Sequence, residues 1–280
     1  MKNDFWMAAT CITPHPPLIV EDIGGSERRR VQATVEAMEK LSTAIAELNP
    51  DVMVMVSPHS PSFESYFTVK KGSILKGNFG NFGVPRVGSV KRNDEELVEA
   101  LLEEASLDGC PLRVFEGNRG RWGDEEDLLD HGLLVPLHFL DKRLDSPIVS
   151  LSISWLDYKE HFRLGELVRR SCENLKRRAV FVASGDLSHR LIPGAPAGYS
   201  PRGKDFDQQI KAIAQSGKFE ELASLDENLV YEAGECGLRS FYTMWGVLKG
   251  LEAEHEVLSY EGPFGVGYLV SLHRVLGVVS

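Results

Sequence analysis

Several features are scarce in this chain, and their scarcity excludes whole classes of protein. Only four of the 280 residues are cysteine, and none of them forms a CxxC pair, so we do not expect a structural zinc knuckle. No apolar run approaches the roughly 18–20 residues of a membrane span, and the first residues lack the pattern of a signal peptide. Scattered cysteines suit a reducing compartment, so the sequence predicts a cytoplasmic protein without a membrane partner.

Positive charge is also in short supply. Lysine and arginine together number 31 against 41 aspartate and glutamate residues, which gives a formal net charge of −10. The one basic block, residues 28–30, has the pattern of a helix face, so nucleic acid is not expected as a partner. Glycine-rich phosphate-binding motifs and a GxSxG nucleophile elbow are absent from the sequence, which argues against nucleotide chemistry and against the common hydrolase arrangement.

Short apolar runs alternate along the chain with segments of helical periodicity. The main predicted strands are residues 5–12, 51–56, 148–154, 179–183 and 266–276. The main predicted helices are residues 25–48, 94–106, 133–140, 158–177, 203–216 and 235–251. This alternation predicts an α/β fold in which residues 1–280 form a single domain with a mostly parallel central sheet and helices on both faces.

Two histidines lie in proline-rich loops directly after predicted strands. His15 is the centre of segment 13–17 (Thr-Pro-His-Pro-Pro), and His59 is the centre of segment 57–61 (Ser-Pro-His-Ser-Pro). Prolines stiffen such loops, and the carboxyl ends of strands in an open α/β sheet border the ligand-binding crevice. A pair of neutral imidazoles held there suits Fe, Zn, Cu or Ni, although each histidine could instead simply cap its strand.

A metal site needs a third protein ligand, and Glu235 is the first candidate. It lies between glycines at the predicted start of an apolar-striped helix, where a carboxylate could equally serve the helix dipole. The neighbouring Cys236 competes with it, and a thiolate there would favour Zn or Cu over iron. Glu232 is a weaker alternative.

His131 and His189 are better interpreted as acid–base residues, because a histidine can both accept and donate a proton near neutral pH. Asp186 precedes His189 by three residues and could orient its ring or cap the local turn. The structural alternatives are a helix cap for His131 and a turn position for His189. Ser184, which follows a strand near His189, leaves a serine hydrolase as a minor alternative. The remaining histidines fit surface or core positions: His138, His161, His255 and His273.

Four segments together resemble a known family. Residues 13–17, 57–59, 130–137 and 184–189 match, in the same order, motifs of the class III extradiol ring-cleavage dioxygenases, in the superfamily of their catalytic subunit. Segment 232–239 is similar to the branch found in AmmeMemoRadiSam system proteins.

The resemblance implies an α/β domain that holds non-haem Fe(II) through His15, His59 and Glu235, with Zn or Cu as alternatives if Cys236 is the ligand. It also implies that His131 and His189 flank the substrate. The expected activity is O2-dependent ring cleavage of a small catecholic substrate. The alternative is a metal-binding or partner-binding module of the same fold without dioxygenase turnover.

Self-association is a further expectation. The predicted helix 235–251 carries an aromatic face formed by Phe241, Tyr242 and Trp245, and the closing strands are apolar. Together they offer more apolar surface than one small sheet would cover, which predicts a homodimer.

Overall fold

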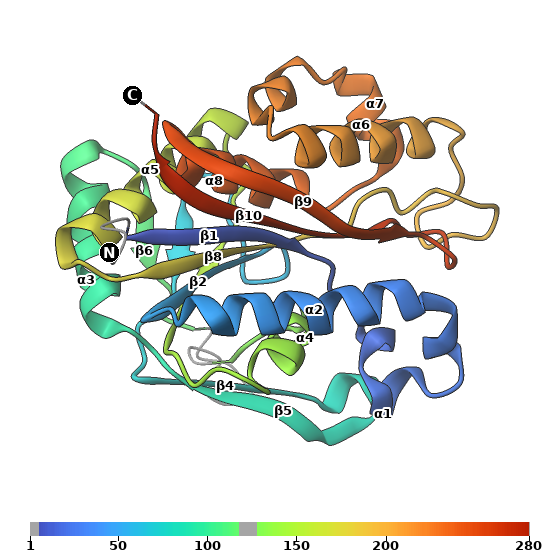
Figure 1. Cartoon of the computed structure of the whole chain (residues 1–280), viewed down its shortest axis with the longest axis horizontal. Coiled ribbons are helices and arrows are strands. Elements are labelled where there is room, and N and C mark those ends of the chain that lie inside the picture. The colour runs from blue at the N-terminus through green and yellow to red at the C-terminus, as the bar shows by residue number, and fades with distance from the viewer. Residues whose placement is uncertain (1–5, 118–127, 280) are drawn as a thin grey trace.

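A computed structural model describes residues 6–117 and 128–279 of the chain. Its centre is an eight-stranded sheet with the strand order β6-β3-β7-β2-β8-β1-β10-β9 (Figure 1). The strands of this sheet are β1 (Met7–Thr13), β2 (Val52–Ser57), β3 (Phe67–Val69), β6 (Leu112–Val114), β7 (Ile148–Ser152), β8 (Ala179–Ser184), β9 (Leu251–Glu261) and β10 (Tyr268–Val278).

The middle of the sheet is parallel. Strand β8 pairs in parallel with β1 and β2, and β2 pairs in parallel with β7. Strands β9 and β10 close one side as an antiparallel pair, and β3 is antiparallel to β7. The predicted α/β fold with a mostly parallel sheet is therefore confirmed, and the closing strands explain why it is not wholly parallel.

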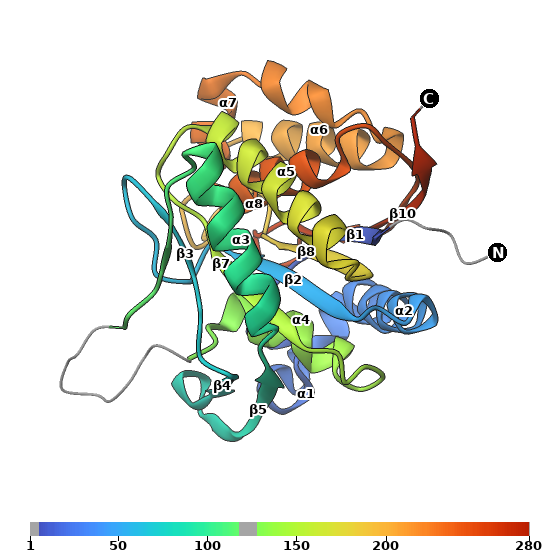
Figure 2. The ribbon, with the colours of Figure 1, turned by 90° about the vertical axis from the view of Figure 1, so that its left-hand side faces the viewer.

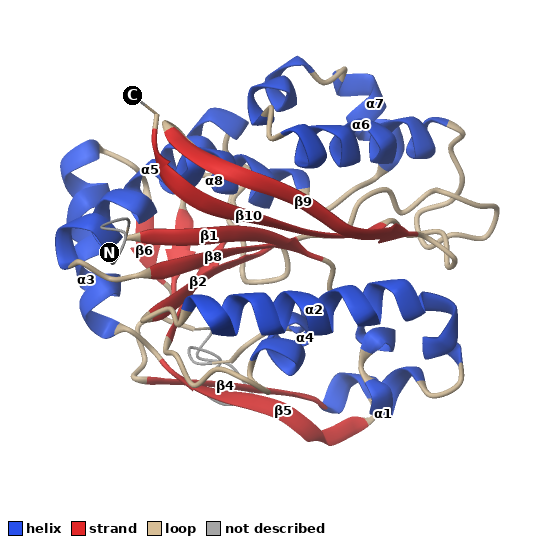
Figure 3. Cartoon of the chain, in the orientation of Figure 1, coloured by secondary structure: helices blue, strands red, loops and turns tan. Residues whose placement is uncertain are grey.

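Helices cover both faces of the sheet, as Figures 2 and 3 show. One face packs against α3 (Glu95–Asp108), α5 (Tyr158–Leu175), α6 (Arg202–Ser216), α7 (Glu227–Ala233) and α8 (Leu238–Leu248). The other packs against α2 (Gln32–Leu48) and α4 (His131–Leu140), beyond which lies a separate hairpin of β4 (Ile74–Phe79) and β5 (Val84–Arg92). The short helices are α1 (Glu21–Gly24), η1 (Pro17–Ile19), η2 (Glu27–Val31), η3 (Gly80–Phe82) and η5 (Phe219–Ser224).

The strand ends that border the predicted crevice are level with one another. Thr13 at the end of β1 pairs with Ser184 at the end of β8, and Ser57 at the end of β2 pairs with Ser152 in β7. His15 and His59 each lie two residues beyond the last residue of their strand. The same offset therefore carries both imidazoles to one edge of the sheet.

The predicted helix 235–251 begins later than expected. Gly234 adopts a left-handed conformation (φ 58°) that ends α7, and α8 starts only at Leu238. Glu235 and Cys236 consequently lie in a short connection between two helices and not in the first turn of one. Apolar periodicity could not place the start of this helix, because the stripe on which the prediction rested begins only at Leu238.

The aromatic face of α8 is directed into the molecule. Tyr242 stacks on Tyr158 of α5 with 4.6 Å between ring centroids, and Trp245 meets Phe162 of α5 at 4.5 Å. Phe241 is 1% exposed. The expectation that these rings form an exposed dimer surface is therefore wrong, because they pack inside the molecule. Self-association itself stays a prediction.

In the part of the chain that the structure describes, no helix combines the length and the apolar character needed to cross a membrane. All four cysteines are unpaired; Cys11, Cys110 and Cys172 are buried, and Cys236 is partly exposed. Cytoplasmic location stays a prediction.

Two glycines allow α5 and α8 to cross closely. A Cβ on Gly246 would lie 1.8 Å from the carbonyl oxygen of Phe162, and one on Gly165 would lie 1.9 Å from that of Thr243. We expect Gly246→Ala to lower the free energy of unfolding in urea by about 2–3 kcal/mol, since overpacking forces backbone to shift. Gln209→Ala, on the exposed side of α6, should change it by less than about 0.5 kcal/mol. Equal stability of Gly246→Ala and the wild type would contradict this packing.

Candidate metal and acid–base site

Three side chains from distant parts of the sequence converge beyond the strand ends. Nε2 of His15 lies 3.0 Å from Nε2 of His59 and 3.6 Å from Sγ of Cys236. Metal bonds of about 2.0 Å to nitrogen and 2.3 Å to sulfur can bridge these separations. Among residues 6–117 and 128–279, this is the one group of three metal-ligating side chains whose donor atoms all lie within 4.8 Å of one another.

The hydrogen bond of Nδ1 determines which nitrogen of the His15 ring carries the proton. Nδ1 of His15 lies 2.9 Å from Oγ of Ser184, and that hydroxyl donates to the carbonyl oxygen of Gly132 at 2.5 Å. Because the hydroxyl proton is engaged with Gly132, Oγ must accept the Nδ1 proton of His15. Nε2 of His15 is therefore left with a free lone pair, as a metal ligand requires.

Side chains also hold the backbone of both histidine loops. The amide of His15 donates to Oδ1 of Asp186 at 3.0 Å, and the amide of His59 donates to Oγ of Ser57 at 3.1 Å. Burial raises the pKa of Asp186 to about 7. His15 is only 2% exposed, whereas His59 is exposed, so the cluster opens to solvent on the His59 side.

His131 is the first residue of α4 and lies beside the cluster. Its ring centroid is 4.0 Å from that of His59 and 5.6 Å from that of His15. The preceding Asp130 caps the helix by accepting from the amide of Gly132 at 2.8 Å, so the cap is Asp130 and not His131. Phe82, at the tip of the β4–β5 hairpin, meets the His131 ring edge-on at 5.4 Å.

His189 lies in the loop after β8. Its ring is oriented by the backbone, and not by Asp186 as was expected. Its Nδ1 donates to the carbonyl oxygen of Leu187 at 3.0 Å, and its amide donates to that of Ala233 at 3.1 Å. The Asp186 carboxylate binds the His15 backbone instead, so the interpretation of Asp186 as the residue that orients His189 is wrong. Sequence proximity suggested that pairing, but the chain turns between the two residues.

Burial favours the neutral forms of the site residues. It lowers the pKa of His15 and, to a lesser extent, those of His131 and His189; neighbouring histidines add to the effect at His15 and His189. Burial also raises the pKa of the Cys236 thiol well above its usual value, with Asp186 and Glu235 acting in the same direction. A metal bound by Cys236 would need the thiolate and would therefore release a proton.

Glu235 lies next to the cluster but is engaged elsewhere. Its Oε2 accepts from the amide of Leu238 at 2.6 Å, at the start of α8, and burial raises its pKa to about 7. Glu232 is directed away, since Oε2 accepts from Oγ of Ser200 at 3.1 Å and Oε1 lies 3.7 Å from Arg202. In this arrangement Cys236, and not Glu235 or Glu232, is the donor that meets the two histidines.

Ser184 does not have the surroundings of a nucleophile. It is fully buried, and both its hydrogen-bonding capacities are used by His15 and Gly132. The serine hydrolase alternative therefore finds no support in the structure.

Sequence reasoning missed the side chains that hold the histidine loops, above all Ser57, Ser60 and Asp130. Oδ1 of Asp130 accepts from Oγ of Ser57 at 2.6 Å, and Oδ2 accepts from Oγ of Ser60 at 2.7 Å. One signal was present, because an aspartate directly before a predicted helix is a common N-cap. Nothing in the sequence indicated that the same carboxylate would reach the loop of His59.

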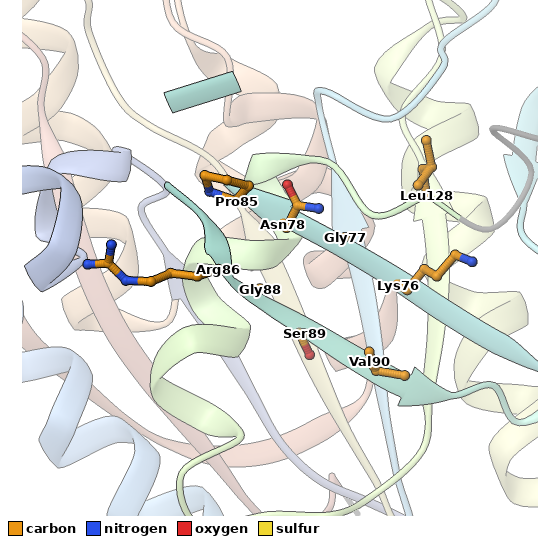
Figure 4. A pocket seen from close by; sticks show the side chains of 9 residues that line it. All are labelled: Lys76, Gly77, Asn78, Pro85, Arg86, Gly88, Ser89, Val90 and Leu128. Atoms are coloured by element: carbon orange, nitrogen blue, oxygen red, sulfur yellow. The ribbon is translucent and has the colours of Figure 1, made fainter. Parts of the chain in front are cut away.

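A hollow lies at the β4–β5 hairpin (Figure 4). Its lining residues are Lys76, Gly77, Asn78, Pro85, Arg86, Gly88, Ser89, Val90 and Leu128. This lining contains no histidine, cysteine or carboxylate, so this hollow has neither the metal-ligating nor the acid–base groups found at the histidine cluster.

Sequence similarity to known proteins extends over most of this chain. The family model described as the catalytic LigB subunit of aromatic ring-opening dioxygenase matches residues 9–271. Protein CA_C1420 of Clostridium acetobutylicum is 35% identical over 258 residues, which cover 92% of this chain and 55% of that protein. The chain thus spans about half the length of this relative.

Two enzymes are more distant relatives. The 2-aminophenol 1,6-dioxygenase beta subunit of Pseudomonas sp. is 26% identical over 92% of this chain and 91% of its own length. The 3,4-dihydroxyphenylacetate 2,3-dioxygenase of Escherichia coli is 23% identical over 86% and 89%. Among solved structures, the uncharacterized protein JW3007 of E. coli K12 shares the fold, with a TM-score of 0.62, 18% identity and coverage of 95% of this chain and 99% of that one.

The four remaining histidines lie apart from this cluster, in the surface or core positions that were predicted for them. His161 and His273 are fully buried, and His138 and His255 are partly exposed. In His161, Nε2 accepts from the amide of Ser154 at 3.3 Å and Nδ1 donates to the carbonyl oxygen of Asp157 at 3.1 Å. Burial lowers the pKa of His161 to about 4.

This neutral, buried His161 should make the fold sensitive to acid. Its unfolded pKa is about 6.5, so between pH 6.5 and 4 the unfolded chain binds a proton that the folded chain does not. Stability should fall in that window as pH decreases, by up to about 1.4 kcal/mol per pH unit for one group. We expect urea unfolding from pH 7.5 to 4.5 to show a shallower decline in His161→Gln than in the wild type. Parallel profiles for the two proteins would rule out this contribution.

Proposed function

Because the chain belongs to the family of the catalytic LigB subunit of aromatic ring-opening dioxygenases, we propose that it uses a bound metal ion and O2 to open the ring of a small catecholic substrate. The observation that carries this proposal is the 3.0 Å approach of the two Nε2 atoms of His15 and His59, with His131 beside them. Ring opening of this kind incorporates both atoms of O2 and breaks a carbon–carbon bond next to the diol. It consumes one O2 per substrate and needs no external reductant.

The metal would be held by His15, His59 and a donor from the connection between α7 and α8. The geometry favours Cys236 as that donor, while Glu235 would have to leave the amide of Leu238 to reach the histidines. Two histidines and a carboxylate suit Fe(II), whereas a thiolate in the third place favours Zn or Cu. When bound, the metal supplies Lewis acidity that favours ionisation of a coordinated hydroxyl.

The remaining residues would handle protons and position the substrate. His131, neutral at pH 7 and next to the exposed side of His59, is placed to accept a proton from a substrate hydroxyl. His189, with Nδ1–H held by the Leu187 carbonyl, keeps Nε2 as its acid–base atom. Phe82, which is exposed and in edge-on contact with His131, offers apolar ring surface for an aromatic substrate.

A second candidate function is a metal-binding or partner-binding module of the same fold without ring-opening turnover. The observation that favours it is the thiol of Cys236 in the place where the resemblance implied a carboxylate. Self-association as a homodimer and a cytoplasmic location also remain part of the proposal, and the four unpaired cysteines are consistent with a reducing compartment.

Oxygen uptake separates the two candidates. Anaerobically purified protein, loaded with Fe(II), is mixed with a panel of catechols and 2-aminophenol in an oxygen electrode. Uptake equimolar with substrate loss, together with a ring-opened product, supports the dioxygenase. Metal bound in equimolar amount without uptake across the panel supports the binding module.

The third metal donor can be identified by substitution. We expect Cys236→Ala to lose most of its bound metal and Glu235→Ala to keep it, because only the Cys236 sulfur meets the His15 nitrogen in the structure. Metal content per chain, measured by elemental analysis after anaerobic purification, checks this. Cys172→Ala, a buried cysteine in α5, is the matched control and should retain the metal. The opposite pattern would assign the site to Glu235.

The acid–base role of His131 and His189 makes a different prediction. His131→Ala and His189→Ala should keep near-full metal occupancy while kcat falls by roughly 10²–10⁴-fold, the usual effect of losing such a group. His138→Ala, in the last turn of the same helix as His131, should keep both metal and activity. A variant that loses metal in proportion to its activity would identify that histidine as a ligand.

A further inference from the structure

The first turn of α4 is linked to both His15 and His59. Gly132 reaches the His15 ring through Ser184, and Asp130 reaches the loop of His59 through Ser57 and Ser60. We propose that Asp130 is a positioning residue that holds the His59 loop and the His131 ring in one fixed geometry. This inference rests on the proposed metal site of His15 and His59. It assigns to Asp130 a function beyond capping its helix.

The Asp130 carboxylate binds three donors from two segments. Oδ1 accepts from Oγ of Ser57 at 2.6 Å and from the amide of Gly132 at 2.8 Å, and Oδ2 accepts from Oγ of Ser60 at 2.7 Å. Ser57 and Ser60 lie on either side of His59 in sequence, and the Ser57 hydroxyl also accepts from the His59 amide at 3.1 Å. One carboxylate therefore fixes the loop before and after the ligand while starting the helix that presents His131.

Comparison with other helix caps shows that capping alone does not require these contacts. Asp94 caps α3 by accepting from the amide of Leu97, and its second oxygen pairs with Arg177 at 3.0 Å. Asp226 caps α7 in the same way, and its second oxygen pairs with Arg202. In Asp130 the second oxygen instead accepts from Oγ of Ser60, in the loop of His59.

The packing around Gly132 in this turn is tight. A Cβ on Gly132 would lie 2.3 Å from Oγ of Ser57 and 3.4 Å from Cδ2 of His59. The carbonyl of the same Gly132 accepts from Ser184, which binds the His15 ring. A shift of the α4 turn would therefore move the supports of both histidines together, and Asp130 prevents that shift on the His59 side.

The decisive variants separate helix capping from loop positioning. Asp130→Ser retains a good N-cap oxygen but cannot bind Ser57, Ser60 and Gly132 together. Asp130→Asn retains Oδ1 for Ser57 and Gly132, and its amide nitrogen can donate to the Ser60 hydroxyl. Ser60→Ala removes only the contact to Oδ2. Asp94→Ala is the control for loss of a cap far from the site.

The measurements are the Kd for Zn²⁺, by competition with a chromophoric chelator, and the Tm of the metal-free protein. We expect Asp130→Ser to weaken Zn²⁺ binding by roughly 10–100-fold, as loss of a residue that orients a ligand does, with a Tm close to that of the wild type. Ser60→Ala should weaken it by about tenfold, at the lower end of that range. Asp130→Asn should restore binding to within a few-fold, and Asp94→Ala should lower Tm without changing Kd.

The outcomes distinguish failure of the metal site from failure of the role of Asp130. If the wild type binds no metal, the proposed site fails and the inference fails with it. If the wild type binds Zn²⁺ and both Asp130→Ser and Ser60→Ala bind it equally well, the inference alone is overturned. A loss of affinity that follows Tm across all variants, including Asp94→Ala, would also overturn it, because Asp130 would then serve stability only. Should Asp130→Ser fail to fold, Ser60→Ala provides the same test.

Discussion

The organisation of the site depends on one directed chain of hydrogen bonds, from the His15 ring to Ser184 and from Ser184 to the backbone of Gly132. Strand β8 lies between β1 and β2, so its last residue occupies the space beneath the two histidine loops. Because the Ser184 hydroxyl has a single proton, its bond to Gly132 determines which nitrogen of His15 is protonated. The sheet, the start of α4 and Nε2 of His15, the proposed metal ligand, are thereby joined in one arrangement.

Local sequence signals were sufficient for most of the fold. The buried runs that became β2 and β8 are short, apolar and rich in β-branched residues, and the stripe of α5 follows helical spacing over its whole length. Two features escaped this kind of reasoning. The helix expected over 235–251 spans only Leu238–Leu248, because Gly234 ends the preceding helix and residues 235–237 belong to the connection, and the aromatic residues of α8 face α5 and not a partner chain. Both depend on tertiary packing, which periodicity does not specify.

The candidate site, like the fold, could be predicted from the sequence only in part. The loops of His15 and His59 were predictable because each motif is local and each follows a strand that ends at the same edge. The choice between Glu235 and Cys236 was not, since it depends on which of two adjacent side chains turns toward the histidines and which toward the start of α8. Nor was the partner of Asp186, because its contact with His15 joins residues 171 positions apart.

The two histidines and the proposed third donor are held by different parts of the fold, and these parts differ in how easily substitutions can change them. His15 and His59 each follow by two residues a strand that is paired in the middle of the central sheet. The proposed third donor comes from a four-residue connection, 234–237, that belongs to no strand and no helix. A single substitution or a small backbone rotation there can exchange a carboxylate for a thiolate while the histidine pair stays in place. Hard and soft metal chemistry are therefore neighbouring solutions on this scaffold, separated by one residue of a connecting loop.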